Sequence, residues 1–66
     1  MDIKTIIKKF EDGEVLSDFE LLHLKMHYED LDKLSRQDPN LKAVSFYSTQ
    51  RLIHVTDIYN ARMSKQ

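Results

Sequence analysis

The sequence has no cysteine or tryptophan and only one glycine and one proline. The absence of cysteine excludes disulfides, and no Cys/His set has the spacing of a structural zinc site. Turn-forming residues are too scarce for a β protein, whereas 41% hydrophobic and 32% charged residues are typical of an ordered helical chain. No uninterrupted apolar run has the length of a membrane span, so we expect a cytoplasmic protein.

Motifs of catalysis are also missing. The chain has no Gly-rich phosphate loop, no recognisable pair of catalytic carboxylates and no G-x-S-x-G element. A chain of 66 residues lacks the volume to enclose a water-excluded pocket, except between subunits. We therefore expect a protein that is not an enzyme and that carries no cofactor or metal.

The short length predicts one domain, residues 1–66, with a marginal core. A domain of this size buries only about 60% of the surface that its unfolded chain exposes. Since neither disulfides nor zinc can stabilise this core, self-association is the remaining way to stabilise the fold. We expect a homo-oligomer.

Charge is distributed unevenly along the chain. Residues 1–38 hold 10 acids and 6 bases, whereas residues 39–66 hold 1 acid and 4 bases. The last part of the chain is therefore the part that attracts anions. The net charge of −1 and the pI of about 6.3 argue against direct nucleic-acid binding.

A short first helix is predicted over residues 2–11. Its apolar residues recur at helical spacing and form one stripe: Ile3, Ile6, Ile7 and Phe10. Asp2 begins it, Lys8 and Lys9 occupy the last turn, where the helix dipole favours cations, and Gly13 can take the left-handed conformation just beyond it.

A second helix is predicted over residues 18–37. Ser17 and Glu20 have the spacing of a capping box, and Leu16 and Leu21 that of a hydrophobic staple. The main stripe consists of Leu21, Leu24, Tyr28, Leu31 and Leu34, with Phe19, Leu22 and Met26 on roughly the opposite side.

Asp38, Pro39 and Asn40 break the pattern, and a third helix follows over residues 40–63. Its main stripe consists of Leu41, Val44, Tyr47, Val55, Ile58 and Tyr59, with Phe46 and Ile53 on its other side. The two long helices form an antiparallel hairpin. The first helix can cover only one of the two extra apolar patches, and we expect the other to meet a second subunit in a helical-bundle oligomer.

Arg51 is the leading candidate for a ligand-binding residue, because it interrupts the apolar stripe of the third helix. A guanidinium there needs an anion. Arg51 either extends its guanidinium to water, or pairs with an acid such as Glu20, Glu29 or one from a neighbouring subunit, or meets an anionic ligand. Tyr47 lies one turn earlier, so base stacking and a phosphate contact can come from adjacent turns.

Two further groups of residues have candidate roles. Arg62 and Lys65 either complement the dipole at the end of the third helix or join Arg51 and Tyr47 in binding a ligand. His23 and His27 lie one turn apart, with His54 level with them across the hairpin, which is a possible metal geometry. The sequence lacks the Glu that the zincin pattern requires after the first His, so core-edge histidines are the favoured interpretation.

The layout resembles small helical proteins that bacteriophages encode early in infection. In outline it is similar to the anti-CBASS cyclic-nucleotide sponge family. The shared features are a short helix, a capped start at residues 13–21, a proline break and a closing helix ending in Tyr59-Asn60-Ala61-Arg62. That resemblance implies a helical-hairpin oligomer that sequesters cyclic oligonucleotides between its subunits, in the cytoplasm of an infected host cell. The aromatic and basic ligand residues of that family are not matched by Phe10, which has no hydroxyl, or by Lys25, which faces away from the main stripe.

The leading hypothesis is thus a non-enzymatic phage-type binding protein that counters a host defence by capturing a nucleotide signal or by docking on a host protein. Nucleotide capture predicts that Arg51, Tyr47 and Arg62 or Lys65 converge at a subunit boundary. Direct docking on a host defence protein predicts that an apolar patch, such as Phe46 and Ile53, stays uncovered in the oligomer. The alternative from another class is an assembly module without a ligand.

Overall fold

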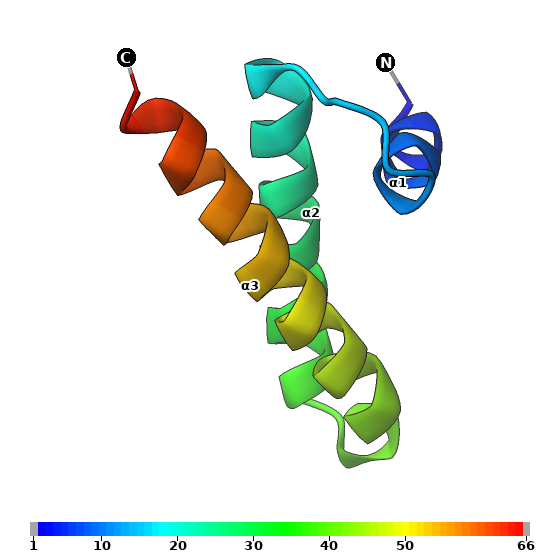
Figure 1. Cartoon of the computed structure of the whole chain (residues 1–66). Helices are drawn as coiled ribbons and strands as arrows, with labels where there is room; N and C mark the ends of the chain where they lie inside the picture. Colours follow the sequence, from blue (N-terminus) through cyan, green and yellow to red (C-terminus); the bar gives the residue numbers. More distant parts are fainter. Residues whose placement is uncertain (1, 66) are drawn as a thin grey trace.

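The computed structural model describes residues 2–65, which form an all-helical fold. Its elements are α1 (Ile3–Glu11), α2 (Asp18–Arg36), the 3-10 turn η1 (Pro39–Leu41) and α3 (Lys42–Met63). Helices α2 and α3 form an antiparallel hairpin, and α1 lies beside α2 at the end of the hairpin away from its turn (Figure 1). This confirms the predicted helices to within one or two residues at each end. Within the described residues, no helix has both the length and the apolar character needed to cross a bilayer.

Local signals fix both ends of α1 as predicted. The Asp2 side chain accepts a hydrogen bond from the backbone N–H of Lys4 at 3.3 Å, and Lys8 and Lys9 lie in the last turn. Gly13 has a φ of 77°, the left-handed conformation that glycine adopts without steric cost. The chain therefore turns sharply after α1 and crosses to the start of α2.

The capping box of α2 is complete. The Ser17 hydroxyl accepts a hydrogen bond from the Glu20 backbone N–H at 3.1 Å, and Glu20 Oε1 accepts one from the Ser17 backbone N–H at 2.9 Å. Leu16 and Leu21 on either side of the cap are both buried, which is the arrangement of the predicted staple. The start of α2 is thus held by polar and apolar contacts together.

The break between the two long helices contains the turn η1. The Asp38 side chain accepts a hydrogen bond from the Asn40 backbone N–H at 3.0 Å, and Pro39 occupies the first turn, where its missing N–H is not needed. The regular α-helix begins at Lys42 and not at Asn40, because the chain first passes through this tighter turn.

The core lies at the end of the hairpin where α1 packs. Its fully buried side chains come from all three α-helices and the loop before α2: Ile6, Leu16, Leu21, Leu24, Tyr28 and Val55. Nearer the turn, the buried positions are instead the small residues Ser35 and Ser48, whose hydroxyls donate to backbone carbonyls of their own helices.

Three predicted core residues are exposed. Leu34 is 64% exposed, and Leu41 and Tyr47 are also exposed. The reason is that α1 covers only the far end of the hairpin, while near the turn Ser35 and Ser48 occupy the buried positions. An apolar stripe on a two-helix hairpin is therefore only partly covered.

Both extra apolar patches remain on the surface. We call Phe19, Leu22 and Met26 the α2 patch, and Phe46 and Ile53 the α3 patch. All five side chains are exposed, with Phe46 67% and Ile53 58% exposed. Helix α1 thus covers neither patch, because its buried residue Ile6 packs into the shared core.

Candidate functional site

Arg51 lies half-buried on α3, against two aromatic rings. Its guanidinium carbon is 5.1 Å from the centre of the Tyr47 ring and 6.0 Å from the centre of the Phe10 ring. A cation at this distance from an aromatic ring is attracted by the negative charge of the ring face. The rings therefore position the guanidinium without neutralising its charge.

The two acids proposed as partners of Arg51 in this chain pair with other cations. Glu20 binds Lys9 at 3.1 Å, and Glu29 binds Lys25 one turn away on α2. Across residues 2–65, Arg51 forms no ion pair or hydrogen bond. The expected pairing with Glu20 or Glu29 was therefore wrong, because nearer lysines take those carboxylates.

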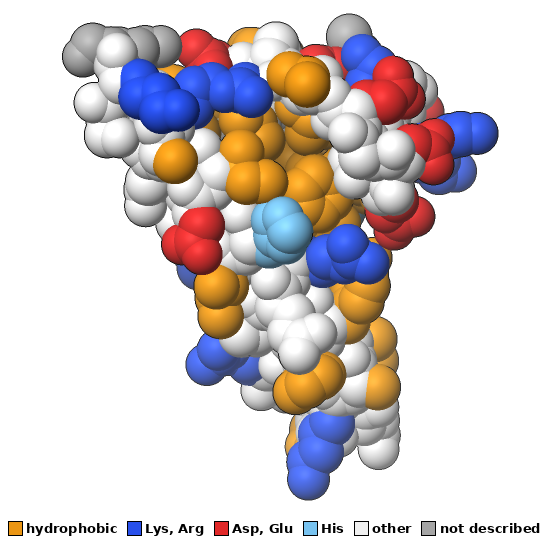
Figure 2. Space-filling view, viewed as in Figure 1, with side chains coloured by type: hydrophobic (Ala, Val, Ile, Leu, Met, Phe, Trp, Pro, Cys, Tyr) orange, Lys and Arg blue, Asp and Glu red, His pale blue; other side chains and the backbone are white. Residues whose placement is uncertain are grey.

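An open hollow of about 350 Å³ lies beside Arg51. The end of α1 and the turn after it form one wall, and α3 forms the other, with these lining residues: Phe10, Glu11, Gly13, Glu14, Arg51, His54 and Ile58. The rings of Phe10 and His54 meet edge to face at 5.3 Å. Figure 2 shows apolar side chains gathered in a furrow beside α3, with basic side chains near its upper end and acidic ones across it toward α1.

This hollow combines donors and acceptors. Arg51 and His54 present nitrogen atoms from α3, and Glu11 and Glu14 present carboxylates from the opposite wall. The carboxylates oppose a highly charged anion, since like charges repel across a short distance. The geometry suits a ligand that offers both an acidic group and a polar donor, over an apolar floor of Phe10 and Ile58.

Tyr47 belongs to the same neighbourhood but does not line the hollow. Its hydroxyl donates to Glu11 Oε1 at 3.4 Å, and its ring meets that of Tyr28 edge to face at 6.3 Å. The Tyr28 hydroxyl is buried and has no hydrogen-bond partner among residues 2–65. Burial raises the pKa of Tyr28 to about 12; the neighbouring Tyr47 hydroxyl adds to this rise, although the two groups do not meet hydrogen-bond geometry.

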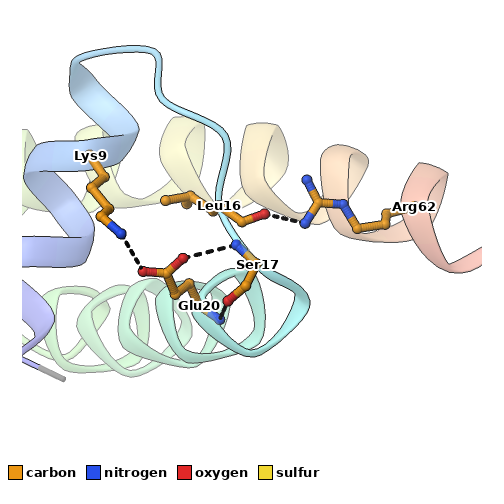
Figure 3. A network of polar contacts seen from close by, with 5 residues as sticks. All are labelled: Lys9, Leu16, Ser17, Glu20 and Arg62. Carbon is orange, nitrogen blue, oxygen red and sulfur yellow. Dashed lines mark hydrogen bonds and ion pairs between the residues drawn. The ribbon is translucent and has the colours of Figure 1, made fainter.

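Arg62 joins the end of α3 to the start of α2. Its Nη1 donates to the backbone carbonyl of Leu16 (Figure 3). The same nitrogen donates to Asp18 Oδ1 at 3.2 Å. Eleven residues separate Arg51 from Arg62, which corresponds to about 16 Å along a helix. Lys65 lies with Arg62 beside a second open hollow of about 370 Å³. Within one chain, the four predicted ligand residues thus form two groups, and their convergence across subunits stays a prediction.

The same close-up shows a contact network that the sequence did not reveal. Glu20 caps α2 through Ser17 and binds Lys9 of α1, on the other side of the loop held by Arg62 (Figure 3). The hydrogen bond from the Ser17 backbone N–H is the main reason that the pKa of Glu20 lies below its ordinary value of 4.5, and the contact with Lys9 lowers it further. The capping box was the one available signal, and it identifies Glu20 but neither Lys9 nor Arg62.

No family model, curated protein or solved structure matches this chain. The proposals below are therefore supported by its own geometry and by the resemblance given above.

The three histidines lie in separate environments. The ring of His23 faces Phe19 at 6.0 Å, that of His27 faces Tyr28 at 5.2 Å, and His54 packs on Phe10. His23 and His27 share an open hollow of about 300 Å³ with Ile3, Met26 and Asp30. Among the residues that the structure describes, no three His, Cys, Asp or Glu side chains come together as a metal site would require.

Proposed function

We propose that this chain is a non-enzymatic binding protein that works as a homo-oligomer and docks on a protein partner through its apolar helical faces. One observation carries the proposal: the fold closes its core and still leaves the α2 patch and the α3 patch on the surface. Large apolar side chains gathered on a small domain are typical of protein interaction surfaces.

The small core supports the same conclusion. Six apolar side chains are buried among residues 2–65. Large apolar side chains that are exposed, such as Phe19, Met26, Phe46 and Ile53, are more numerous than the buried ones. Covering them by association adds hydrophobic stabilisation that the monomer lacks.

As a setting for this activity we propose a phage-encoded protein that opposes a host defence, with a host defence protein as the docking partner. This part of the proposal rests on the resemblance to the small helical phage proteins. A structural assembly module would use the same patches for self-association alone.

Sedimentation velocity across micromolar concentrations tests the association. We expect a dimer or larger species whose proportion grows with concentration. A matched pair of double variants, Phe46→Ser with Ile53→Ser and Phe19→Ser with Met26→Ser, identifies which patch associates. A wild-type protein that stays monomeric throughout would contradict the proposed oligomer.

Capture of a nucleotide signal is a second candidate, and Arg51 is the observation that favours it. The guanidinium lies between two rings, beside an open hollow, without an acidic partner in the described chain. Arginine in such a position can bind phosphate while a neighbouring ring stacks on a base. Glu11 and Glu14 oppose this use, so it ranks after protein docking.

Titration calorimetry with a cyclic dinucleotide separates the two candidates. If capture is right, the wild type binds, and Arg51→Met folds normally but binds more weakly by a few kcal/mol, typical of a charge-assisted contact. The control Lys33→Met, at an exposed lysine outside the candidate site, should have a smaller effect. Absence of heat with the wild type would remove this ligand class and leave protein docking.

A further inference from the structure

The outer face of α3, defined by Lys42, Phe46, Gln50, Ile53 and Asp57, is the surface from which an inference can be drawn. These five residues are exposed, and at 3.6 residues per turn they form one stripe along the helix. The stripe lies opposite Ser48 and Val55, which are 0% exposed. It therefore points away from the rest of the molecule.

The charges on this face lie at its two ends. Lys42 precedes Phe46 by one turn, and Asp57 follows Ile53 by one turn. In the described part of the chain neither Lys42 nor Asp57 forms an ion pair, whereas Lys9, Lys25, Arg36 and Arg62 all do. The face thus has a cation at one end, an anion at the other and two large apolar side chains between them.

This order is self-complementary when the helix is reversed. The numbers of Phe46 and Ile53 add up to 99, and so do those of Lys42 and Asp57. A second α3 laid antiparallel about a two-fold axis near Gln50 brings Phe46 onto the partner's Ile53 and Lys42 onto the partner's Asp57. Each contact then occurs twice, as in any two-fold symmetric interface.

We propose that the outer face of α3 binds the same face of a second copy of this chain in an antiparallel, two-fold symmetric dimer. The inference rests on the proposed homo-oligomer and names its interface. A parallel pairing would place Lys42 on the partner's Lys42 and Asp57 on the partner's Asp57, which like-charge repulsion disfavours. The α2 patch lacks this symmetry, since Asp30 and Lys33 both follow Met26 toward the same end of the helix.

Charge reversal tests the pairing by sedimentation equilibrium. Lys42→Asp and Asp57→Lys each turn two attractive pairs into two repulsive ones, so each should raise the dimer dissociation constant about tenfold at low salt. The double variant restores opposite charges at both ends and should recover wild-type association. Lys65→Asp, which changes the net charge as much as Lys42→Asp but lies off this face, should have little effect. Circular dichroism verifies that each variant folds.

Cross-linking tests the direction of the helices. Because the chain has no cysteine, a single Gln50→Cys variant places one thiol near the two-fold axis and should form a disulfide dimer on mild oxidation. The matched control Asn60→Cys lies on the same side of α3 but about 31 Å from its counterpart in the antiparallel pair, so it should not cross-link.

The outcomes are distinct. Equal cross-linking of both cysteine variants would overturn the antiparallel direction. A wild-type oligomer that ignores the charge reversals and fails to cross-link at Gln50→Cys would overturn this interface and leave the proposed homo-oligomer standing. A monomeric wild type would overturn both.

Discussion

Tyr28 carries a hydroxyl group into the core without a hydrogen-bond partner. An unsatisfied buried hydroxyl costs about 1–3 kcal/mol, whereas the ring contributes packing. Tyr28→Phe should therefore leave the free energy of unfolding unchanged or raise it by about 1 kcal/mol, as measured by urea denaturation. Tyr47→Phe, which removes an exposed hydroxyl bonded to Glu11, is the matched control. A loss above 1 kcal/mol in Tyr28→Phe would mean that the hydroxyl has a partner in solution.

Arg51 shows how far single residues can be interpreted from sequence. Its position in the apolar stripe predicted a guanidinium that is partly buried, which the structure confirms, and an anionic partner, which the described residues do not supply. The Phe10 ring was not predictable, because it comes from α1 and depends on how α1 packs against the hairpin. The same holds for Arg62, whose partners Leu16 and Asp18 lie more than 40 residues away in sequence.

The helices themselves were predictable because their ends carry local signals. Ser17, Glu20, Pro39 and Gly13 mark boundaries through hydrogen bonds or φ angles that involve only near neighbours. Burial was less predictable: Leu34 lies on the predicted stripe of α2 and is exposed. Periodicity identifies one side of a helix, but which part of that side is covered depends on the position of α1.

The cap of α2 makes a prediction at the scale of one element. Ser17→Ala removes the oxygen that accepts a hydrogen bond from the Glu20 backbone N–H, and should lower the free energy of unfolding by about 1 kcal/mol. Thermal melts of both proteins at equal concentration measure the effect. Ser64→Ala serves as the control. Ser64 follows the C-terminal end of α3, and its hydroxyl caps no helix N-terminus. Equal melting temperatures for Ser17→Ala and wild type would show that this cap does not stabilise α2.

Among the described residues, one ion pair joins the basic part of the chain to the acidic part. Residues 39–66 are basic and residues 1–38 acidic, and Arg62 of the basic part binds Asp18 of the acidic part. Thr49 of α3 likewise donates to Asp32 of α2 at 2.8 Å. Two carboxylates of α2, Asp18 at its start and Asp32 near its end, therefore accept hydrogen bonds from α3.

Acidification should accordingly destabilise the fold. The Ser17 backbone N–H and Lys9 hold the pKa of Glu20 below 4.5, and the Thr49 hydroxyl and Arg36 hold the pKa of Asp32 below 3.8. Each carboxyl binds fewer protons in the folded chain than in the unfolded one, so its stabilising contribution is complete above these ordinary values and is lost as the pH falls through the folded-state pKa. The urea concentration at the midpoint of unfolding should therefore decrease as the pH is lowered from about 5 to about 3.

Neutral variants assign this loss to particular carboxyls. Glu20→Gln and Asp32→Asn should each unfold at lower urea than wild type near pH 7, because the charged contacts to Lys9 or Arg36 are gone. Each should also show a shallower decline on acidification, since one titrating group has been removed. The difference between wild type and variant therefore isolates one carboxyl, even though other acids titrate in the same range. Parallel pH profiles for wild type and Glu20→Gln would contradict the role of Glu20, because a contact that depends on ionisation must weaken when the carboxylate is protonated.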